Sequence, residues 1–147
     1  MKIISPIVEI AKRVCPAVIT VVVSRDLPRA ESFYSFPFGG KEYIMPNPPT
    51  GKKKGKTEKT QIGGGSGFIV SSNGYILTSN HVVADSTADY TVILDPKHKY
   101  PAKVLSRNPI NDTAILKIEG RGFPFIGMAN SDKVELGEEL VEVANAL

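Results

Sequence analysis

The stretch Gly67–Ser79 reads GFIVSSNGYILTS and contains two apolar runs around a short polar turn. Asn73-Gly74 lies between these runs, and Asn-Gly between apolar runs is the strongest short-range signal for a β-hairpin. The sequence therefore predicts two antiparallel strands, at 67–71 and 75–79. A histidine, His81, follows almost directly after the second strand.

Further strands are predicted on both sides of this hairpin. Residues 17–24 form a continuous, largely β-branched run that is typical of a buried strand. Downstream, the pattern predicts a second hairpin, formed by residues 89–94 and 100–106. It also predicts two later strands, at 113–118 and at 139–143. Short strands at this spacing favour an all-β barrel over a sheet built from βαβ units.

Two regions near the N-terminus do not follow this strand pattern. Ser5 can cap a short helix that begins at Pro6 and ends before Pro16. Residues 25–62 lose all periodicity and contain several prolines, followed by glycines and lysines. Because loops of this length are usually functional or disordered, we expect a long flexible loop here, with residues 47–62 mobile.

Composition and charge narrow the class of protein. The 147 residues fit one domain, and the net charge of +3 comes largely from the lysines of residues 52–59. The single Cys15 excludes an internal disulfide, and its place at the predicted helix end suggests a packed or semi-buried thiol. The sequence contains no apolar span of 18 residues, so no membrane-spanning helix is expected, and no signal peptide is visible.

The main catalytic candidates are His81 and Asp112. Asp112 follows Asn111 at the start of the predicted strand 113–118. A histidine base and a buried aspartate that orients it form two parts of a nucleophilic triad. Taken alone, His81 could instead cap a turn, and Asp112 could be an ordinary turn aspartate.

Other residues give weaker signals. Ser66 lies in a glycine-rich run that leads into a strand rather than a helix, so we interpret it as structural rather than as a nucleophile. His98 lies at a predicted hairpin tip and is expected to be solvated. Two histidines and one cysteine are too few for a metal site, so no metal or other cofactor is expected. The lysines of residues 52–59 lack interleaved aromatics, so nucleic acid is not an expected partner.

Three motifs together resemble a known family. Gly65–Val70, Gly74–Val83 and Asn111–Ile118 fit, in this order, the trypsin-like serine proteases, and most closely their HtrA/Deg branch. The resemblance covers nearly the whole chain. It implies that residues 1–147 form a trypsin-like antiparallel six-stranded β-barrel with a short N-terminal helix. It also implies that His81 is the general base and that Asp112 orients it.

The resemblance also carries expectations about function. The branch has its serine in a Gly-Asn-Ser-Gly-Gly segment of a second barrel, and no such segment occurs in these 147 residues. We therefore expect the first barrel of a serine endopeptidase that acts on unfolded or misfolded proteins, with the second barrel absent and the fragment inactive alone. The alternative is a non-catalytic half-protease module for oligomerisation or peptide binding. The resemblance further implies a homo-oligomer, a trimer, in an extracytoplasmic compartment such as the periplasm.

Overall fold

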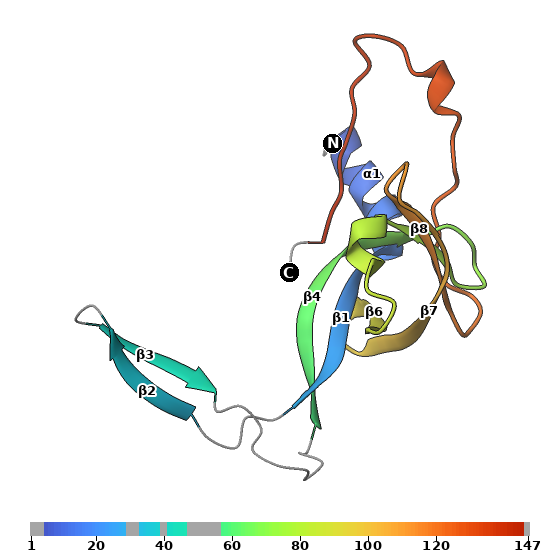
Figure 1. Ribbon diagram of the computed structural model, residues 1–147. Coiled ribbons are helices and arrows are strands. Elements are labelled where there is room, and N and C mark those ends of the chain that lie inside the picture. Colours follow the sequence, from blue (N-terminus) through green and yellow to red (C-terminus); the bar gives the residue numbers. More distant parts are fainter. Residues whose placement is uncertain (1–4, 29–32, 39–40, 47–56, 146–147) are drawn as a thin grey trace. The chain divides into compact units, whose positions relative to one another are not determined.

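The computed structural model describes residues 5–28, 33–38, 41–46 and 57–145. The chain divides into two compact units, one formed by Met1–Ser24 with Gln61–Leu147 and the other by Arg25–Thr60. The first unit is a β-barrel, and the second contains a two-stranded hairpin. Figure 1 shows the strands of each unit.

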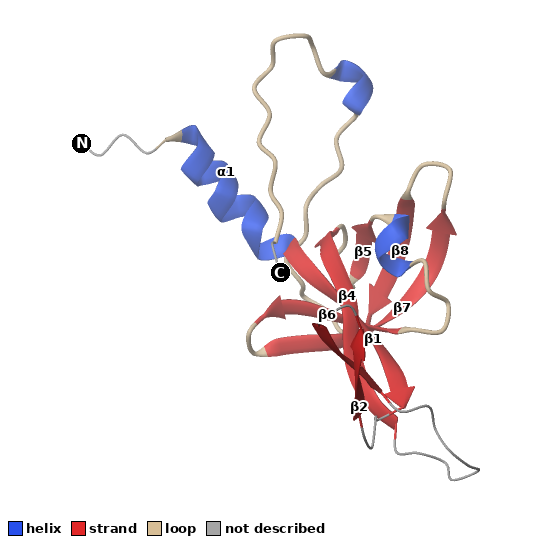
Figure 2. Cartoon of the chain, turned by 60° about the vertical axis from the view of Figure 1, so that its left-hand side comes forward, coloured by secondary structure: helices blue, strands red, loops and turns tan. Residues whose placement is uncertain are grey.

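Six antiparallel strands close the barrel of the first unit in the order β1-β4-β5-β8-β7-β6. Their bounds are β1 Val18–Pro28, β4 Thr57–Ile69, β5 Tyr75–Thr78, β6 Asp89–Asp95, β7 His98–Asn108 and β8 Thr113–Ile118. Helix α1 (Pro6–Val14) and the 3-10 turn η1 (Cys15–Ala17) lead into β1 (Figure 2). The predicted fold class, a six-stranded antiparallel barrel with a short N-terminal helix, is confirmed.

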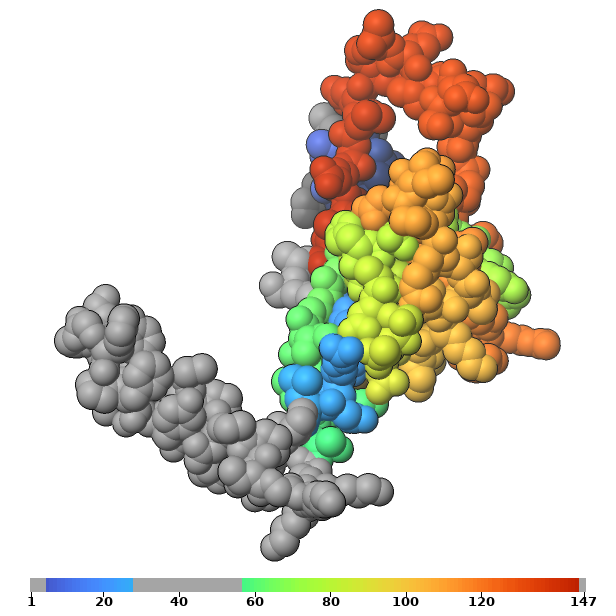
Figure 3. Space-filling model, viewed as in Figure 1, coloured from blue at the N-terminus to red at the C-terminus, as the bar shows by residue number. Residues whose placement is uncertain are grey.

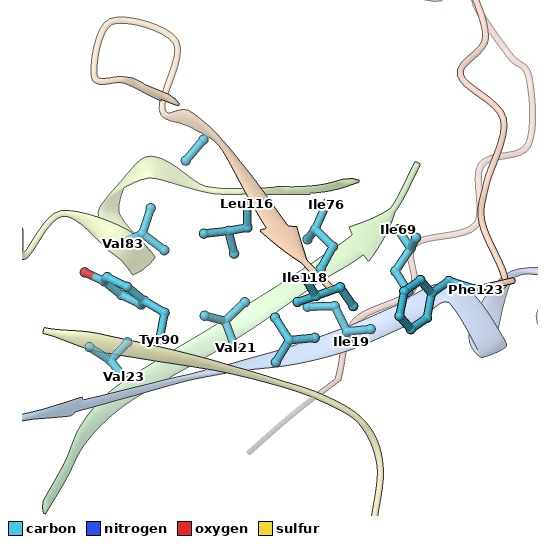
Figure 4. Packing of buried hydrophobic residues seen from close by; sticks show 12 residues of the cluster. Ile19, Val21, Val23, Ile69, Ile76, Val83, Tyr90, Leu116, Ile118 and Phe123 are labelled. Carbon is cyan, nitrogen blue, oxygen red and sulfur yellow. The ribbon is translucent and has the colours of Figure 1, made fainter. Parts of the chain in front are cut away.

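The barrel interior is filled by apolar side chains that alternate along the strands (Figure 4). In β8, for example, Ala114 and Leu116 are buried while Ile115 between them is exposed. The largest fully buried side chains come from five of the strands and one turn: Ile19, Val21, Ile69, Ile76, Val83, Val92, Leu116 and Ile118. A period-two pattern therefore directs one face of each strand into the core.

The two predicted hairpins are both present. Gly67 of β4 pairs with Thr78 of β5, and Tyr90 of β6 pairs with Ala102 of β7. The first turn contains Gly74, whose φ of +90° lies in the left-handed region that favours glycine. The Gly74 carbonyl also accepts the Ile118 N–H at 3.0 Å, so this turn is tied to β8.

Replacing Gly74 by alanine is expected to destabilise the chain by about 2–4 kcal/mol, from left-handed strain and a steric clash. An added Cβ would lie 2.5 Å from the Ile118 carbonyl oxygen. Gly122→Ala is the matched control, because Gly122 has a φ of +77° but no atom within 4 Å of an added Cβ. Urea unfolding of both variants gives the comparison, and equal losses of stability would show that the clash contributes nothing.

The predicted strand at 139–143 is wrong. The structure assigns no strand there, and after β8 the described chain contains only the short 3-10 turn η3 (Ser131–Lys133). Figure 3 shows this segment as an arch that leaves the barrel surface. The physical reason is that a strand needs a hydrogen-bonded neighbour, and all six barrel strands already pair on both sides. Leu136 and Leu140 consequently remain exposed.

The predicted absence of regular structure over 25–62 is also wrong in part. Strand β1 continues to Pro28 and β4 begins at Thr57. Between them, β2 (Phe33–Phe38) and β3 (Lys41–Pro46) pair as an antiparallel hairpin, with Phe36 opposite Tyr43. The prolines of this region concealed the strands, since proline is tolerated at edge positions that donate no ladder bond. Residues 47–56, which include most of the lysine run, lie outside the described residues.

The N-terminal segment confirms one prediction and contradicts another. Helix α1 begins at Pro6 and ends at Val14, as its spacing and prolines indicated. Cys15, however, is exposed rather than packed, because none of the α1 residues before it is buried. None of the helices in the described residues has the length and the apolar character of a membrane-spanning helix.

Candidate functional site: a histidine and an aspartate on adjoining turns

His81 lies in the 3-10 turn η2 (Asn80–Val83), directly after β5. The turn is anchored by the two valines that follow the histidine. Val83 is fully buried in the core, and Val82 packs against its edge. Gly65 of β4 lets Val82 approach closely, since a Cβ there would lie 2.5 Å from Val82 Cγ2. The apolar pair therefore holds the turn against the barrel while His81 stays at the surface.

Asp112 lies in the connection between β7 and β8, immediately before β8 begins. Its φ of +49° is the only positive value among the described residues other than glycine. Aspartate tolerates this left-handed conformation better than most residues. The connection is also held by Asn108, whose Oδ1 accepts the N–H groups of Ile110 at 3.1 Å and Asn111 at 3.2 Å.

The structure brings His81 and Asp112 together, as the sequence predicted. Asp112 Oδ2 lies 2.7 Å from His81 Nδ1, and Asp112 Oδ1 accepts the His81 N–H at 2.9 Å. The Asp112 carbonyl also accepts the Asn80 N–H at 3.1 Å. The prediction that the aspartate is buried is wrong, because the side chains of His81 and Asp112 are 73% and 51% exposed. In this chain the pair lies on an open surface between two turns.

The hydrogen bonds decide which His81 nitrogen carries the proton. The His81 backbone N–H, and then the His81 ring, lower the pKa of the Asp112 carboxyl below its ordinary 3.8. Asp112 is therefore ionised at neutral pH and can only accept hydrogen bonds. A short contact to Nδ1 consequently requires a proton on Nδ1, which leaves the lone pair of Nε2 free in the neutral ring. This tautomer suits a general base that acts through Nε2.

The Asp112 carboxyl is expected to titrate below 3.8 in a carbon-detected NMR titration of the folded chain. Because folding depresses this pKa, the pair stabilises the fold above the unfolded pKa, and this contribution is lost as the pH falls through the folded pKa. In His81→Ala the backbone N–H remains, so the Asp112 pKa should rise only part of the way. A return to the ordinary value in that variant would show that the ring, not the backbone, is the main cause.

Two further candidates have other partners. Ser66 Oγ donates to the Asn145 carbonyl at 2.8 Å and accepts the Asn145 N–H at 3.0 Å, so its hydroxyl serves a structural contact. His98 is not simply solvated, since its Nδ1 lies 2.6 Å from Asp95 Oδ2 in the β6–β7 turn. The signal for this second pair, an aspartate three residues before a histidine across a turn, was missed.

Sequence reasoning also missed one residue beside the site. Arg107 of β7 donates from Nε to the Val83 carbonyl at 2.7 Å, at the end of the turn that carries His81. A single arginine on a strand gives no pattern that would identify this contact in advance. Among the described residues, no group of three or more histidine, cysteine, aspartate or glutamate side chains could hold a metal ion.

Comparisons with known proteins place this geometry in a family. The family model of the trypsin-like peptidase domain matches residues 65–147, which include both turns. The chain is 38% identical over 101 residues, 69% of its length, to a "probable periplasmic serine endoprotease DegP-like" of Ectopseudomonas mendocina. It is 30% identical to proteins with the same description from Pseudomonas putida, over 146 residues, and Bartonella henselae, over 155 residues, each alignment covering 93% of the chain.

These matches also show how much of each relative is represented. The aligned chain spans 20%, 30% and 31% of the length of the three relatives. It therefore corresponds to about a third or less of each of those proteins. The family model nevertheless covers more than half of the present chain, and the barrel has the strand arrangement expected for that family. The chain belongs to the trypsin-like peptidase family, and its relatives are DegP-like serine endoproteases.

Proposed function

We propose that this chain supplies the general base and the orienting carboxylate of a serine endopeptidase. The observation that carries the proposal is the 2.7 Å contact between His81 Nδ1 and Asp112 Oδ2 in a trypsin-like peptidase barrel. In this role His81 Nε2 takes the proton of a serine hydroxyl as the serine attacks the scissile carbonyl. The same nitrogen then returns the proton to the leaving amine, while Asp112 stabilises the imidazolium that forms in between.

The serine itself is proposed to come from residues outside these 147. In the described part of the chain, no serine hydroxyl is hydrogen-bonded to His81, and the sequence contains no Gly-Asn-Ser-Gly-Gly segment. Residues 1–147 would then be the first barrel of a two-barrel peptidase domain. Without an activated nucleophile and oxyanion donors, the 147-residue chain alone is expected to be inactive.

The substrate, assembly and compartment are also part of the proposal. The family resemblance supports unfolded or misfolded polypeptides as substrates and a homo-oligomer, a trimer, as the working form. The relatives are described as periplasmic, which supports an extracytoplasmic location for this chain. Proteolysis of damaged proteins in such a compartment is the role that is consistent with this substrate class, assembly and location.

A second candidate function is a non-catalytic module for self-association or peptide binding. The observation that favours it is the set of exposed apolar side chains after β8, namely Phe125, Met128, Val134, Leu136, Leu140 and Val141. Exposed apolar residues gathered on one segment are typical of interaction surfaces. The two functions differ in whether peptide bonds are cleaved, so one assay separates them.

The test is proteolysis by the polypeptide encoded by the complete reading frame that contains these residues. It is assayed on a reduced, unfolded protein and on the same protein in its native state, with the 147-residue chain in parallel. Cleavage of the unfolded substrate, blocked by a serine-reactive fluorophosphonate, would support the endopeptidase. Binding of the unfolded substrate without cleavage would favour the second function and contradict the first.

A further inference from the structure

The turn that carries His81 is short and depends on its surroundings for support. Turn η2 is only four residues long and has no side-chain cap. The Val82 N–H donates to the Ser79 carbonyl at 3.2 Å, so the turn is tied to the residue that precedes it. Short 3-10 segments have poor hydrogen-bond geometry and are stable only in a supporting context. The direction of the His81 ring therefore depends on bonds from outside the turn.

The first residues of the turn are fixed by Asp112. Its carbonyl accepts the Asn80 N–H, its Oδ1 accepts the His81 N–H, and its Oδ2 bonds to the ring. These contacts fix where the turn begins. They leave its end, the Val83 carbonyl, to be held by another group.

Arg107 holds that end. Its Nε donates to the Val83 carbonyl at 2.7 Å in a partly buried position. The donor is charged, and hydrogen bonds from charged donors are shorter and about twice as strong as neutral ones. The Val83 side chain is fully buried below this carbonyl, so the arginine and the core hold the residue from two sides.

The two supports belong to the same hairpin. Arg107 of β7 pairs with Ala114 of β8, only two residues beyond Asp112, and the next pair, Asn108 with Thr113, closes the ladder. The β7–β8 hairpin thus contacts both ends of the turn, through Asp112 at its start and Arg107 at its end. Any shift of one end relative to the other must change the distance between His81 Nδ1 and Asp112 Oδ2.

We propose that Arg107 is a positioning residue for His81. It holds the end of η2 through the Val83 carbonyl, so that the His81 ring stays aligned with Asp112. This inference rests on the proposed endopeptidase function for its catalytic consequence, whereas its structural part concerns the 147-residue chain itself. Arg107 does not contact the ring and takes no part in proton transfer.

The chemistry of the side chain provides a sharp test. Glutamine places an amide N–H₂ at the same bond position from Cα as the arginine Nε, so Arg107→Gln keeps a donor and loses the charge. Lysine has a methylene at that position and its ammonium donors lie one bond further out, so Arg107→Lys keeps the charge but cannot donate from the position of Nε. If Arg107 acts through its bond to the Val83 carbonyl, Arg107→Gln should preserve the alignment of the His81 ring with Asp112 better than Arg107→Lys.

The first measurement is NMR of the 147-residue chain, following the Nδ1 proton of His81. In Arg107→Lys we expect this proton to exchange with water about 10-fold faster, the effect of losing one hydrogen bond. In Arg107→Gln the change should be smaller. His98, whose Nδ1 bonds to Asp95 in the same chain, is the internal reference and should not change. Arg121→Lys, at an exposed arginine after β8, is the matched control.

The second measurement is peptidase kinetics in the complete polypeptide. Arg107→Lys should lower kcat about 10- to 100-fold with KM unchanged, because misplacement of a catalytic group acts on the chemical step. Arg107→Gln should recover most of that loss. If the unsubstituted polypeptide shows no peptidase activity, the proposed function fails, and the NMR comparison still decides the role of Arg107.

Two outcomes would overturn the proposal. The first is an Arg107→Lys spectrum in which the His81 Nδ1 proton behaves as in Arg121→Lys. The second is better preservation by lysine than by glutamine, which would assign Arg107 a purely electrostatic role. Should Arg107→Lys fail to fold, Arg107→Gln alone decides, since a retained His81 signal supports the contact and a lost signal contradicts it.

Discussion

Alanine in place of His81 should lower the kcat of the proposed endopeptidase by about 10⁴-fold or more, the usual effect of removing the base of a serine triad. The serine hydroxyl would lose the group that takes its proton, and the leaving amine would lose its acid. Cleavage of an unfolded protein by the complete polypeptide gives the measurement. KM should change little, because the imidazole acts on the chemical step.

The control for this prediction is His98→Ala. His98 is the chain's other histidine and also bonds to an aspartate, Asp95, but it lies in the β6–β7 turn. Its removal should leave kcat unchanged. Equal losses in the two variants would indicate a general effect on folding, and an active His81→Ala enzyme would contradict the catalytic role.

Leu116→Ala is expected to reduce the free energy of unfolding of the 147-residue chain by about 2–5 kcal/mol. Leu116 is 0% exposed in the middle of β8, inside the closed barrel. The substitution removes buried apolar atoms and leaves a cavity that the closed strand arrangement cannot collapse. Urea unfolding followed by circular dichroism measures the change, and the unchanged slope of the transition would confirm that the folded state stays intact.

Leu105→Ala is the matched control, because it makes the same chemical change on the neighbouring strand. Leu105 of β7 is 51% exposed, and a surface substitution of this kind usually changes stability by less than about 1 kcal/mol. A large loss in Leu105→Ala would mean that the outer face of the barrel is covered by another part of the protein in solution. Similar small losses in both variants would contradict the core assignment.

Much of the barrel could be predicted from sequence because its signals are local. Asn73-Gly74 fixed one turn, and β-branched runs with period two marked the strands around the core. The prediction of a strand at 139–143 was wrong for a reason that no local sequence pattern shows. Its residues have strand propensity, but a strand needs a neighbouring strand to pair with, and each of the six barrel strands already has a neighbour on both sides.

The candidate site was predictable to a lesser degree. His81 and Asp112 could be named because each follows or precedes a strand within a family motif. Their mutual distance, the exposure of Asp112 and its left-handed φ come from the packing of two turns, which no local pattern specifies. Arg107 could not be found from sequence at all, since its partner is a backbone carbonyl 24 residues away.

The closed barrel also has a consequence for how the chain folds. Its hairpins, β4–β5, β6–β7 and β7–β8, join residues that are near neighbours in sequence and need little loop closure. Strand β1 is different, because Thr20 pairs with Ile93, and about 70 residues of chain must be organised before that contact can form. Long-range pairing of this kind slows folding. We therefore expect β1 to pair with β6 last. The entropic cost of this late loop closure would then set the folding rate of the whole barrel.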